Sequence, residues 1–185
     1  PVVVVAGPTA SGKSLLAADI AEKFGGVVIN ADSMQVYRGI EMLSGAPDAA
    51  LRARAPHRLY GILDPAERCS AGDWRARAIN EIRIAHSEGA LPVVTGGTGM
   101  YLRALMTGLA RMPPIPDDIR TSIRHRMDIH GSAVLHEELR QYDPDTAEML
   151  APGDRQRISR GLELLEATGQ GLSAWQKGGE NSSED

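Results

Sequence analysis

The feature that most constrains this chain is a glycine-containing segment that directly follows a short apolar run. Residues 2–6 are Val-Val-Val-Val-Ala, and the next eight are Gly7-Pro8-Thr9-Ala10-Ser11-Gly12-Lys13-Ser14. A buried strand that turns through glycines into a helix opening at Lys-Ser is typical of a phosphate-binding loop. Its backbone N–H groups point into one concavity, Lys13 adds a positive charge, and the Ser14 hydroxyl can ligate Mg²⁺. The sequence therefore predicts a domain that holds a diphosphate or triphosphate, which leaves kinases, ATPases, GTPases and transferases open.

Composition limits the broad class of protein. The chain has 185 residues, of which 42% are hydrophobic and 24% charged, and this suits one compact domain with a small insertion. Its single cysteine, Cys69, excludes a disulfide framework. No apolar stretch approaches the roughly 20 residues of a membrane span, and none precedes a signal-cleavage pattern. We expect a cytoplasmic protein without a membrane partner, and we expect a monomer.

The charge is acidic in total but uneven in kind. A formal net charge of −4 argues against a protein that coats nucleic acid generally. Seventeen of the twenty basic residues are arginines, the better side chain for bidentate phosphate contacts. They include two groups close in sequence, Arg120, Arg124 and Arg126, then Arg155, Arg157 and Arg160. A local basic face is therefore possible, and ion pairs with carboxylates such as Glu163 are the open alternative.

Apolar runs and helical periodicity alternate along the first 110 residues. Strands are expected at residues 2–6, 27–29 and 91–95, with 59–63 as a strand or sheet edge, and helices at 13–24, from an Asp73 N-cap through Ser87, and at about 100–109. In the first helix, Leu16, Ile20 and Phe24 recur on one face. Strands separated by helices imply a parallel sheet with right-handed crossovers. The fold class expected is therefore α/β, a P-loop NTPase-like parallel sheet flanked by helices.

After residue 111 the pattern changes to short helices. They are expected at 117–129, 133–142 and 144–150, and a further helix capped by Asp154 runs to Thr168. We interpret residues 111–150 as a small helical insertion or lid. The core would comprise residues 1–110 and 151–177, and the polar residues 178–185 would form a disordered tail.

Chemistry is expected at the carboxyl edge of the sheet, where ligands bind to such folds. Asp32 follows the second strand, so its carboxylate can ligate Mg²⁺ through water or accept a proton. The open alternative is a turn cap formed by Asp32 and Ser33. Gly96-Gly97-Thr98-Gly99 repeats the strand, glycine turn and helix plan, although such a turn can also be a plain connection. The five histidines and Cys69 lack metal-ligand spacing, and we assign them no chemistry.

Five segments together resemble the tRNA dimethylallyltransferase family. They are the loop at 7–14, Asn-Ala-Asp-Ser-Met-Gln-Val-Tyr-Arg-Gly at 30–39, Pro-His-Arg-Leu at 56–59, Gly-Gly-Thr-Gly-Met-Tyr at 96–101, and Asp-Arg-Gln-Arg-Ile-Ser-Arg at 154–160. Their order and intervals match as well, over about residues 2–176. The resemblance implies transfer of a dimethylallyl group from dimethylallyl diphosphate to N6 of the adenosine on the 3′ side of the tRNA anticodon, with Mg²⁺ as the cofactor.

The resemblance also implies roles for individual residues. Gly7, Pro8, Thr9, Ala10, Ser11, Gly12, Lys13 and Ser14 would hold the diphosphate, and a Mg²⁺ near Ser14 would help to stabilise the leaving group. Lys13, Asp32 and Thr98 would form the catalytic set, with Asp32 as the base. The adenine would be flipped out of the anticodon loop. The residues implied to contact tRNA are Asp32, Ser33, Met34, Gln35, Thr98, Arg120, Gln156, Arg157, Ile158, Ser159 and Arg160.

Two features depart from the family pattern. Where the family usually has Gly-Thr-Ala-Lys-Pro, this chain has Leu43-Ser44-Gly45-Ala46-Pro47, so a diphosphate contact from that lysine is missing. Family members also continue well past the position of Gly169, and the chain starts at Pro1 rather than at methionine. A fragment and a catalytically complete chain both stay open, and a fragment would bind substrate yet turn over poorly.

Three alternatives remain open. A kinase of small molecules or nucleosides would hold ATP in the same loop and use Asp32 to activate a hydroxyl. An adenylate-type isopentenyltransferase would alkylate free AMP or ATP, but the helical insertion and the basic helix after it favour tRNA. A non-enzymatic nucleotide-binding or RNA-binding module predicts that Asp32→Ala leaves every measurable function intact.

Overall fold

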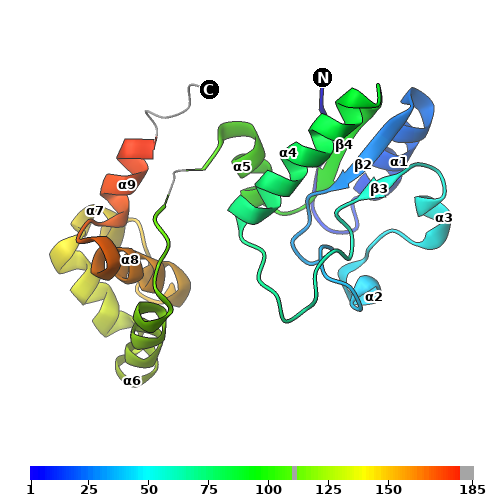
Figure 1. Ribbon diagram of the computed structural model, residues 1–185. Coiled ribbons are helices and arrows are strands. Elements are labelled where there is room, and N and C mark those ends of the chain that lie inside the picture. Colours follow the sequence, from blue (N-terminus) through cyan, green and yellow to red (C-terminus); the bar gives the residue numbers. More distant parts are fainter. Residues whose placement is uncertain (110–111, 180–185) are drawn as a thin grey trace. The chain divides into compact units, whose positions relative to one another are not determined.

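The chain forms two compact units, Pro1–Gly108 and Leu109–Asp185, in a computed structural model that describes residues 1–109 and 112–179 (Figure 1). The elements of the first unit are β1 (Val3–Ala6), α1 (Lys13–Phe24), β2 (Gly26–Asn30), α2 (Glu41–Ser44), α3 (Ala49–Arg52), β3 (His57–Arg58), α4 (Ala71–Ser87), β4 (Leu91–Gly96) and α5 (Gly99–Thr107). Those of the second are α6 (Asp117–Tyr142), α7 (Pro144–Glu148), α8 (Arg155–Thr168) and α9 (Leu172–Gly179).

The first unit is built on a four-stranded parallel sheet in the order β1-β4-β2-β3, which confirms the expected α/β class. The three main predicted strands are present within one or two residues of their expected ends. The run 59–63 is not a strand: β3 ends at Arg58, and Leu63 makes only an isolated bridge to Tyr37. The reason is local, since Leu59 has a left-handed φ of 62°, which extended backbone cannot accommodate.

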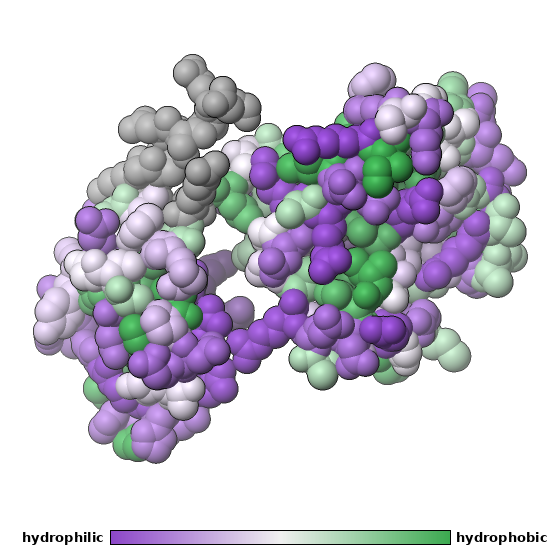
Figure 2. Space-filling model, in the orientation of Figure 1, coloured by the Kyte–Doolittle hydropathy of each residue, from purple (hydrophilic) through white to green (hydrophobic). Residues whose placement is uncertain are grey.

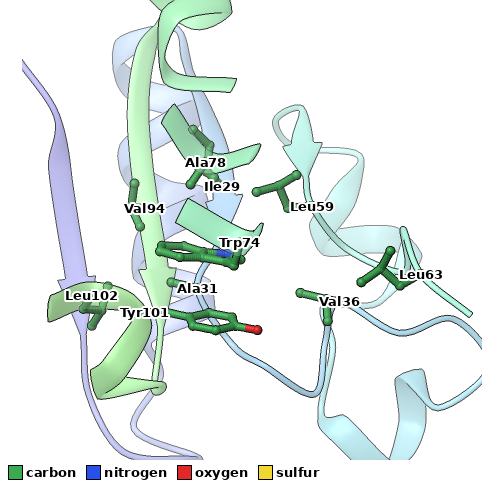
Figure 3. Close-up of a cluster of buried hydrophobic side chains, with 10 residues drawn as sticks. All are labelled: Ile29, Ala31, Val36, Leu59, Leu63, Trp74, Ala78, Val94, Tyr101 and Leu102. Carbon is green, nitrogen blue, oxygen red and sulfur yellow. The ribbon is translucent and has the colours of Figure 1, made fainter. Parts of the chain in front are cut away.

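Apolar side chains cover both faces of the sheet, because alternate residues of a strand point to opposite sides. On one face, Ile29 and Val94 pack against Trp74 of α4 and Tyr101 of α5 (Figure 3). The two rings are stacked, with centroids 4.5 Å apart and planes 8° apart, and the buried indole N–H donates to the backbone oxygen of Asn30 at 2.8 Å. This contact fixes the carboxyl end of β2, where the candidate site begins.

Helix α1 begins and ends where the sequence predicts, but it buries a different face. Leu16 and Phe24 are 51% and 60% exposed, whereas Ala17, Ala18 and Ala21 are buried. The prediction of an inward Leu16-Ile20-Phe24 stripe was therefore wrong for its two ends. Helix and sheet approach so closely that a Cβ on Gly26 would lie 3.1 Å from Cα of Ala21, and only small residues fit between them.

The N-cap of helix α4 lies three residues before the predicted Asp73 cap. Ser70 is the N-cap: its hydroxyl oxygen accepts from the backbone N–H of Asp73, and the Asp73 carboxylate accepts from the backbone N–H of Ser70. Asp73 therefore stands at the third helical position of a capping box, a pattern that the sequence Ser-x-x-Asp also permits.

The second unit has its own apolar core. Helix α8 packs on α6, with Ile158 and Leu162 against Ile123 and Leu139. Gly161 allows this approach, since a Cβ there would lie 3.1 Å from both methyl groups of Leu139. The structure therefore differs from the predicted division, because residues of 151–177 share a core with the helical segment before them. Of the predicted tail, residues 178 and 179 end α9, and residues 180–185 lie outside the described residues.

The expected break between two helices falls at Gly131, whose φ of 78° interrupts α6. Taken separately, each unit presents mainly hydrophilic residues on the face seen in Figure 2, with smaller hydrophobic patches within its own surface. Within residues 1–109 and 112–179, none of the helices combines the length and the apolar character that crossing a bilayer requires.

Asp143 is a buried carboxylate that links three helices of the second unit. It accepts hydrogen bonds from the hydroxyl groups of Thr146 and Ser173 at 2.7 and 2.6 Å and from their backbone N–H groups at 3.2 and 3.1 Å. Burial alone would raise the pKa of Asp143, but these hydrogen bonds from Ser173 and Thr146 outweigh it and lower the pKa below the ordinary value.

This lowered pKa predicts an acid-sensitive contribution to stability. A depressed carboxylate pKa stabilises the folded state above the unfolded-state value of about 3.9, and the stabilisation is lost as the pH falls through the folded-state value. We expect Asp143→Asn to lower the free energy of unfolding at pH 7 by about 1.5–3 kcal/mol, and the difference from the unsubstituted chain to shrink below about pH 4. Urea unfolding of both proteins at several pH values measures this difference in the free energy of unfolding. Asp128→Asn, which removes an exposed ion pair with Arg155, should change the free energy by no more than about 0.5 kcal/mol.

Candidate functional site

The phosphate loop connects β1 to the first turn of α1. Gly12, the N-cap of α1, has a left-handed φ of 78°, and Ala10 has a φ of 62°, so the loop turns sharply twice before the helix. The Lys13 ammonium donates to the backbone oxygen of Pro8 at 3.0 Å. The loop is therefore closed over itself by its own lysine, and its backbone N–H groups lie at the positive end of a 12-residue helix.

Asp32 stands in the turn that follows β2. The Asn30 side chain shapes this turn, since its Oδ1 accepts from the backbone N–H of Asp32 at 2.9 Å and its Nδ2 donates to the backbone oxygens of Asp32 and Leu59. Oδ1 of Asp32 accepts from the backbone N–H of Met34 at 2.9 Å. The turn-cap alternative is thus correct for one carboxylate oxygen, and Oδ2 receives no hydrogen bond from the described part of the chain.

The turns after β2 and β4 are tied together through Thr98. Its hydroxyl oxygen accepts from the backbone N–H of Ser33 at 2.9 Å and donates to the Ser33 hydroxyl at 3.2 Å. The backbone N–H of Thr98 also donates to the oxygen of Ala31 at 3.2 Å. In this structure Thr98 therefore fixes the Asp32 turn against the glycine turn.

Gly97 marks the point where the loop, the lysine and the carboxylate meet. A Cβ on Gly97 would lie 3.2 Å from the backbone oxygen of Gly7, 3.9 Å from Oδ2 of Asp32 and 3.9 Å from Cε of Lys13. One methyl group on this turn would thus touch residues from two others, the phosphate loop and the Asp32 turn. The predicted convergence at the carboxyl edge of the sheet is present, and the glycine turn has a steric role there that a plain connection would not need.

The phosphate loop and Asp32 open into a pocket of about 780 Å³. Loop residues 9–14 line it, whereas Gly7 and Pro8 are not among its lining residues. Its other lining residues are Leu15, Asp32, Gln35, Ser44, Gly45, Ala46, Pro47, Asp48, Ala50, Leu51 and Arg54. Apart from its comparison of residues 43–47 with the family motif, sequence reasoning missed the segment 44–54. The one local signal is Asp48, which caps α3 by accepting from the N–H of Leu51 at 2.8 Å.

The residues predicted to contact tRNA in the first unit differ in their availability. Met34 is 54% exposed, whereas Gln35 is only 8% exposed. The Gln35 amide donates to the backbone oxygens of Ser44 and Gly45 at 3.0 and 3.2 Å. Its NH₂ group therefore holds the pocket segment in place.

The remaining predicted tRNA contacts lie in the second unit. Ile158 is fully buried in the core of that unit, so the predicted RNA contact of its side chain is wrong. Its apolar spacing in α8 is the reason, because that side of the helix faces α6. Arg120, Arg157 and Arg160 form ion pairs with Asp117, Asp154 and Glu163 at 3.3–3.5 Å. These pairs are exposed to differing degrees, and the Arg157 side chain is 72% exposed.

Two titratable groups in or just after the pocket-lining segment, Arg54 and His57, have shifted pKa values. Hydrogen bonds to Glu22 and Asp19 raise the pKa of Arg54. Burial lowers the pKa of His57, whose Nδ1 lies 2.7 Å from the oxygen of Ala55. The pocket lining includes several hard oxygens, and among them the Ser14 hydroxyl and the Asp32 carboxylate are ligand types that suit Mg²⁺. No cluster of three or more His, Cys, Asp or Glu suited to a metal occurs among residues 1–109 and 112–179.

The parallel sheet, the phosphate loop at the start of α1 and the carboxylate at the sheet edge define a protein of the P-loop NTPase-like class. Within that class, the family model described as IPP transferase matches residues 35–184. The chain belongs to the IPP transferase family.

Similar proteins carry consistent names. A tRNA dimethylallyltransferase of Rhodospirillum centenum is 50% identical over 179 residues, which are 97% of this chain and 57% of the relative. One of Paramagnetospirillum magneticum is 51% identical over 176 residues, 95% of this chain and 56% of the relative. The chain thus spans little more than half the length of the curated relatives it matches.

Two solved structures extend the comparison. A eukaryotic dimethylallyltransferase acting on tRNA matches with a TM-score of 0.78 at 31% identity, covering 95% of this chain and 44% of that one. A full-length tRNA isopentenylpyrophosphate transferase of Bacillus halodurans matches with a TM-score of 0.59 at 34% identity, covering 91% of this chain and 56% of that one.

Proposed function

We propose that this chain takes part in transferring a dimethylallyl group from dimethylallyl diphosphate to N6 of the adenosine on the 3′ side of the tRNA anticodon. The observation that carries the proposal is the meeting of Lys13 and Oδ2 of Asp32 beside the phosphate loop, at Gly97. The membership of the chain in the IPP transferase family supports it. Loop, lysine and carboxylate face one pocket, so a donor held there would present its reactive carbon near a base.

The phosphate loop suits the leaving group of this reaction. As the allylic C–O bond breaks, negative charge gathers on the diphosphate oxygens, where the loop N–H groups and the Lys13 ammonium stabilise it. Lys13 would exchange its hydrogen bond to Pro8 for one to a phosphate oxygen. This charge stabilisation grows as the bond breaks, so it accelerates the step instead of only tightening ground-state binding.

Asp32 suits the acceptor side. The N6 amine of adenosine forms the new C–N bond and must lose one proton, and Oδ2 of Asp32 would take it. Oδ1 stays engaged by the N–H of Met34, which orients the carboxylate before substrate arrives. Thr98 and Ser33 lock the same turn and would keep Oδ2 in position.

Magnesium fits this pocket as the cofactor. The Ser14 hydroxyl would hold it together with the donor phosphates, and Asp32 is the nearby carboxylate that a bound water could contact. When bound, the ion would neutralise charge on the diphosphate. The chain's own residues supply the remaining electrostatic stabilisation through Lys13 and the loop backbone.

On the RNA side, the proposal keeps the exposed residues and drops Ile158. Met34 lies beside Asp32 in sequence and is available to the flipped base. In the second unit, Arg120, Gln156, Arg157, Ser159 and Arg160 would contact the tRNA backbone. Arg157 is the most exposed of the three arginines and would exchange its ion pair for a phosphate. We further propose a cytoplasmic monomer.

A donor comparison tests the proposal against the kinase alternative. The chain is titrated with dimethylallyl diphosphate and with ATP in the presence of Mg²⁺, and release of inorganic phosphate from ATP is followed in parallel. The proposal predicts binding of dimethylallyl diphosphate and no hydrolysis of ATP. Hydrolysis of ATP that Lys13→Ala abolishes would instead favour a kinase or ATPase.

A further inference from the structure

The pocket also has apolar lining that the phosphate chemistry does not use. Outside the phosphate loop, five apolar residues line it: Leu15, Ala46, Pro47, Ala50 and Leu51. We call these five residues the apolar wall. Ala46 and Pro47 lie between α2 and α3 (Figure 1), Ala50 and Leu51 belong to α3, and Leu15 is from the first turn of α1. Water contact with such a wall is unfavourable, so an apolar ligand group beside the phosphates would be stabilised there.

Hydrogen bonds hold the apolar wall in place. At one end, the buried Gln35 amide donates to the oxygens of Ser44 and Gly45. In the middle, Nε of Arg52 donates to the oxygen of Pro47 at 3.0 Å, while the Arg52 guanidinium lies 5.1 Å from the centre of the Tyr60 ring. The segment is therefore preorganised, which a surface needs in order to discriminate ligands by size.

Arg54 lines the same pocket, but its positive charge is already paired with two carboxylates. Its guanidinium pairs with Asp19 at 2.6 Å and with Glu22 at 2.5 Å, both on α1. These two partners occupy the arginine and fasten the residues after α3 to α1. Ala46, where the family motif has lysine, adds no charge to the wall. The lining outside the loop thus offers apolar contact at the five wall residues, beside the polar side chains of Gln35, Ser44 and Asp48.

We propose that the apolar wall binds the hydrocarbon chain of the prenyl diphosphate donor and that Leu51 limits the length of chain accepted. This inference rests on the proposed function for the identity of the donor. A diphosphate seated in the loop would extend its carbon chain across the pocket, between Asp32 and the wall. Of the two wall residues in α3, Leu51 is larger than Ala50 and is half-buried. A donor with a longer hydrocarbon chain would have to displace its side chain.

The apolar wall should therefore give diphosphates different affinities according to the hydrocarbon chain that each one carries. Each buried methylene is worth about a fourfold change in affinity. For partial burial of five carbons, we expect dimethylallyl diphosphate to bind about ten- to a hundredfold more tightly than inorganic diphosphate. Leu51→Ala should reduce that ratio about three- to tenfold and raise the relative affinity for geranyl diphosphate, because it removes contact area and leaves space.

Equilibrium titration of the chain with inorganic diphosphate, dimethylallyl diphosphate and geranyl diphosphate, all with Mg²⁺, tests this. Inorganic diphosphate reports whether the loop is intact, so a variant that has lost its fold is recognised directly. Ala46→Leu is the second variant: it narrows the pocket and should weaken both prenyl ligands while leaving inorganic diphosphate unchanged. Leu43→Ala is the matched control, since Leu43 is 89% exposed and does not line the pocket.

The outcomes separate this inference from the proposed function. A ratio of prenyl to inorganic diphosphate affinity that falls in Leu51→Ala and Ala46→Leu, but not in Leu43→Ala, supports the wall even if no tRNA is modified. A ratio near one, or one that neither wall variant changes, overturns the wall even if the chain transfers dimethylallyl groups.

Discussion

Replacing Asp32 with asparagine is expected to lower the rate of dimethylallyl transfer about a thousandfold while the affinity for the donor changes less than about twofold. Asparagine keeps an oxygen that can accept from the Met34 N–H, so the turn is retained. It cannot accept the proton that leaves N6, and general-base catalysis contributes about a hundred- to ten-thousandfold. Single-turnover rates with saturating donor and tRNA measure the effect.

The chain offers a matched control for this substitution. Oδ1 of Asp64 accepts from the backbone N–H of Ala66 at 3.0 Å, which is the same two-residue turn geometry as Asp32 and Met34. Asp64 does not line the pocket. Asp64→Asn should therefore leave the transfer rate within about twofold. If Asp32→Asn behaves like Asp64→Asn, Asp32 is only a turn cap and the assigned base is wrong.

The second large effect is expected from alanine substitutions at two neighbouring glycines. One should lower the stability of the fold and the other should weaken diphosphate binding. Gly96→Ala is expected to lower the free energy of unfolding by about 4 kcal/mol or more, because the new Cβ would lie 2.1 Å from the backbone carbonyl of Ala31. Strands β2 and β4 would have to separate. Gly97→Ala is expected to remain folded and to bind diphosphate at least about tenfold more weakly, since its methyl group would enter the space beside Lys13 and Asp32.

Urea unfolding and diphosphate titration of both variants make the comparison. The two glycines are adjacent in sequence, so a general sensitivity of this turn would affect both in the same way. Normal diphosphate binding by a folded Gly97→Ala would show that the substrate does not occupy the space where loop, lysine and carboxylate meet.

Motif spacing could predict the fold class and most element boundaries. The loop, its glycine at the helix N-terminus and the glycine after α1 are local signals, and local chemistry decides them. The inward face of α1 was not predictable in this way. Its Leu16 and Phe24 fit an apolar stripe, yet the distance from helix to sheet at Gly26 admits only alanines. That distance is a property of the packed structure.

Some residues of the candidate site could also be predicted from the sequence, and others could not. Asp32, Lys13 and the phosphate loop follow from the order of strand, turn and helix, because parallel strands bring their carboxyl ends to one edge. The apolar wall does not, since the chain departs from the family motif at Ala46 and the wall is held in place by hydrogen bonds of Gln35, Arg52 and Asp48. Ile158 shows the opposite error: a family motif placed it on the RNA, and its burial assigns it to a helix core.

The central claim is tested most directly by the mass of the nucleosides in treated tRNA. Unmodified tRNA with adenosine 3′ to the anticodon is incubated with Mg²⁺, dimethylallyl diphosphate and either the chain or its Asp32→Ala variant, and the RNA is then digested and its nucleosides weighed. We predict an adenosine heavier by one dimethylallyl group in the unsubstituted enzyme and its absence in the variant. Unmodified adenosine in every reaction, or the same mass gain with Asp32→Ala, would contradict the assigned reaction or its base.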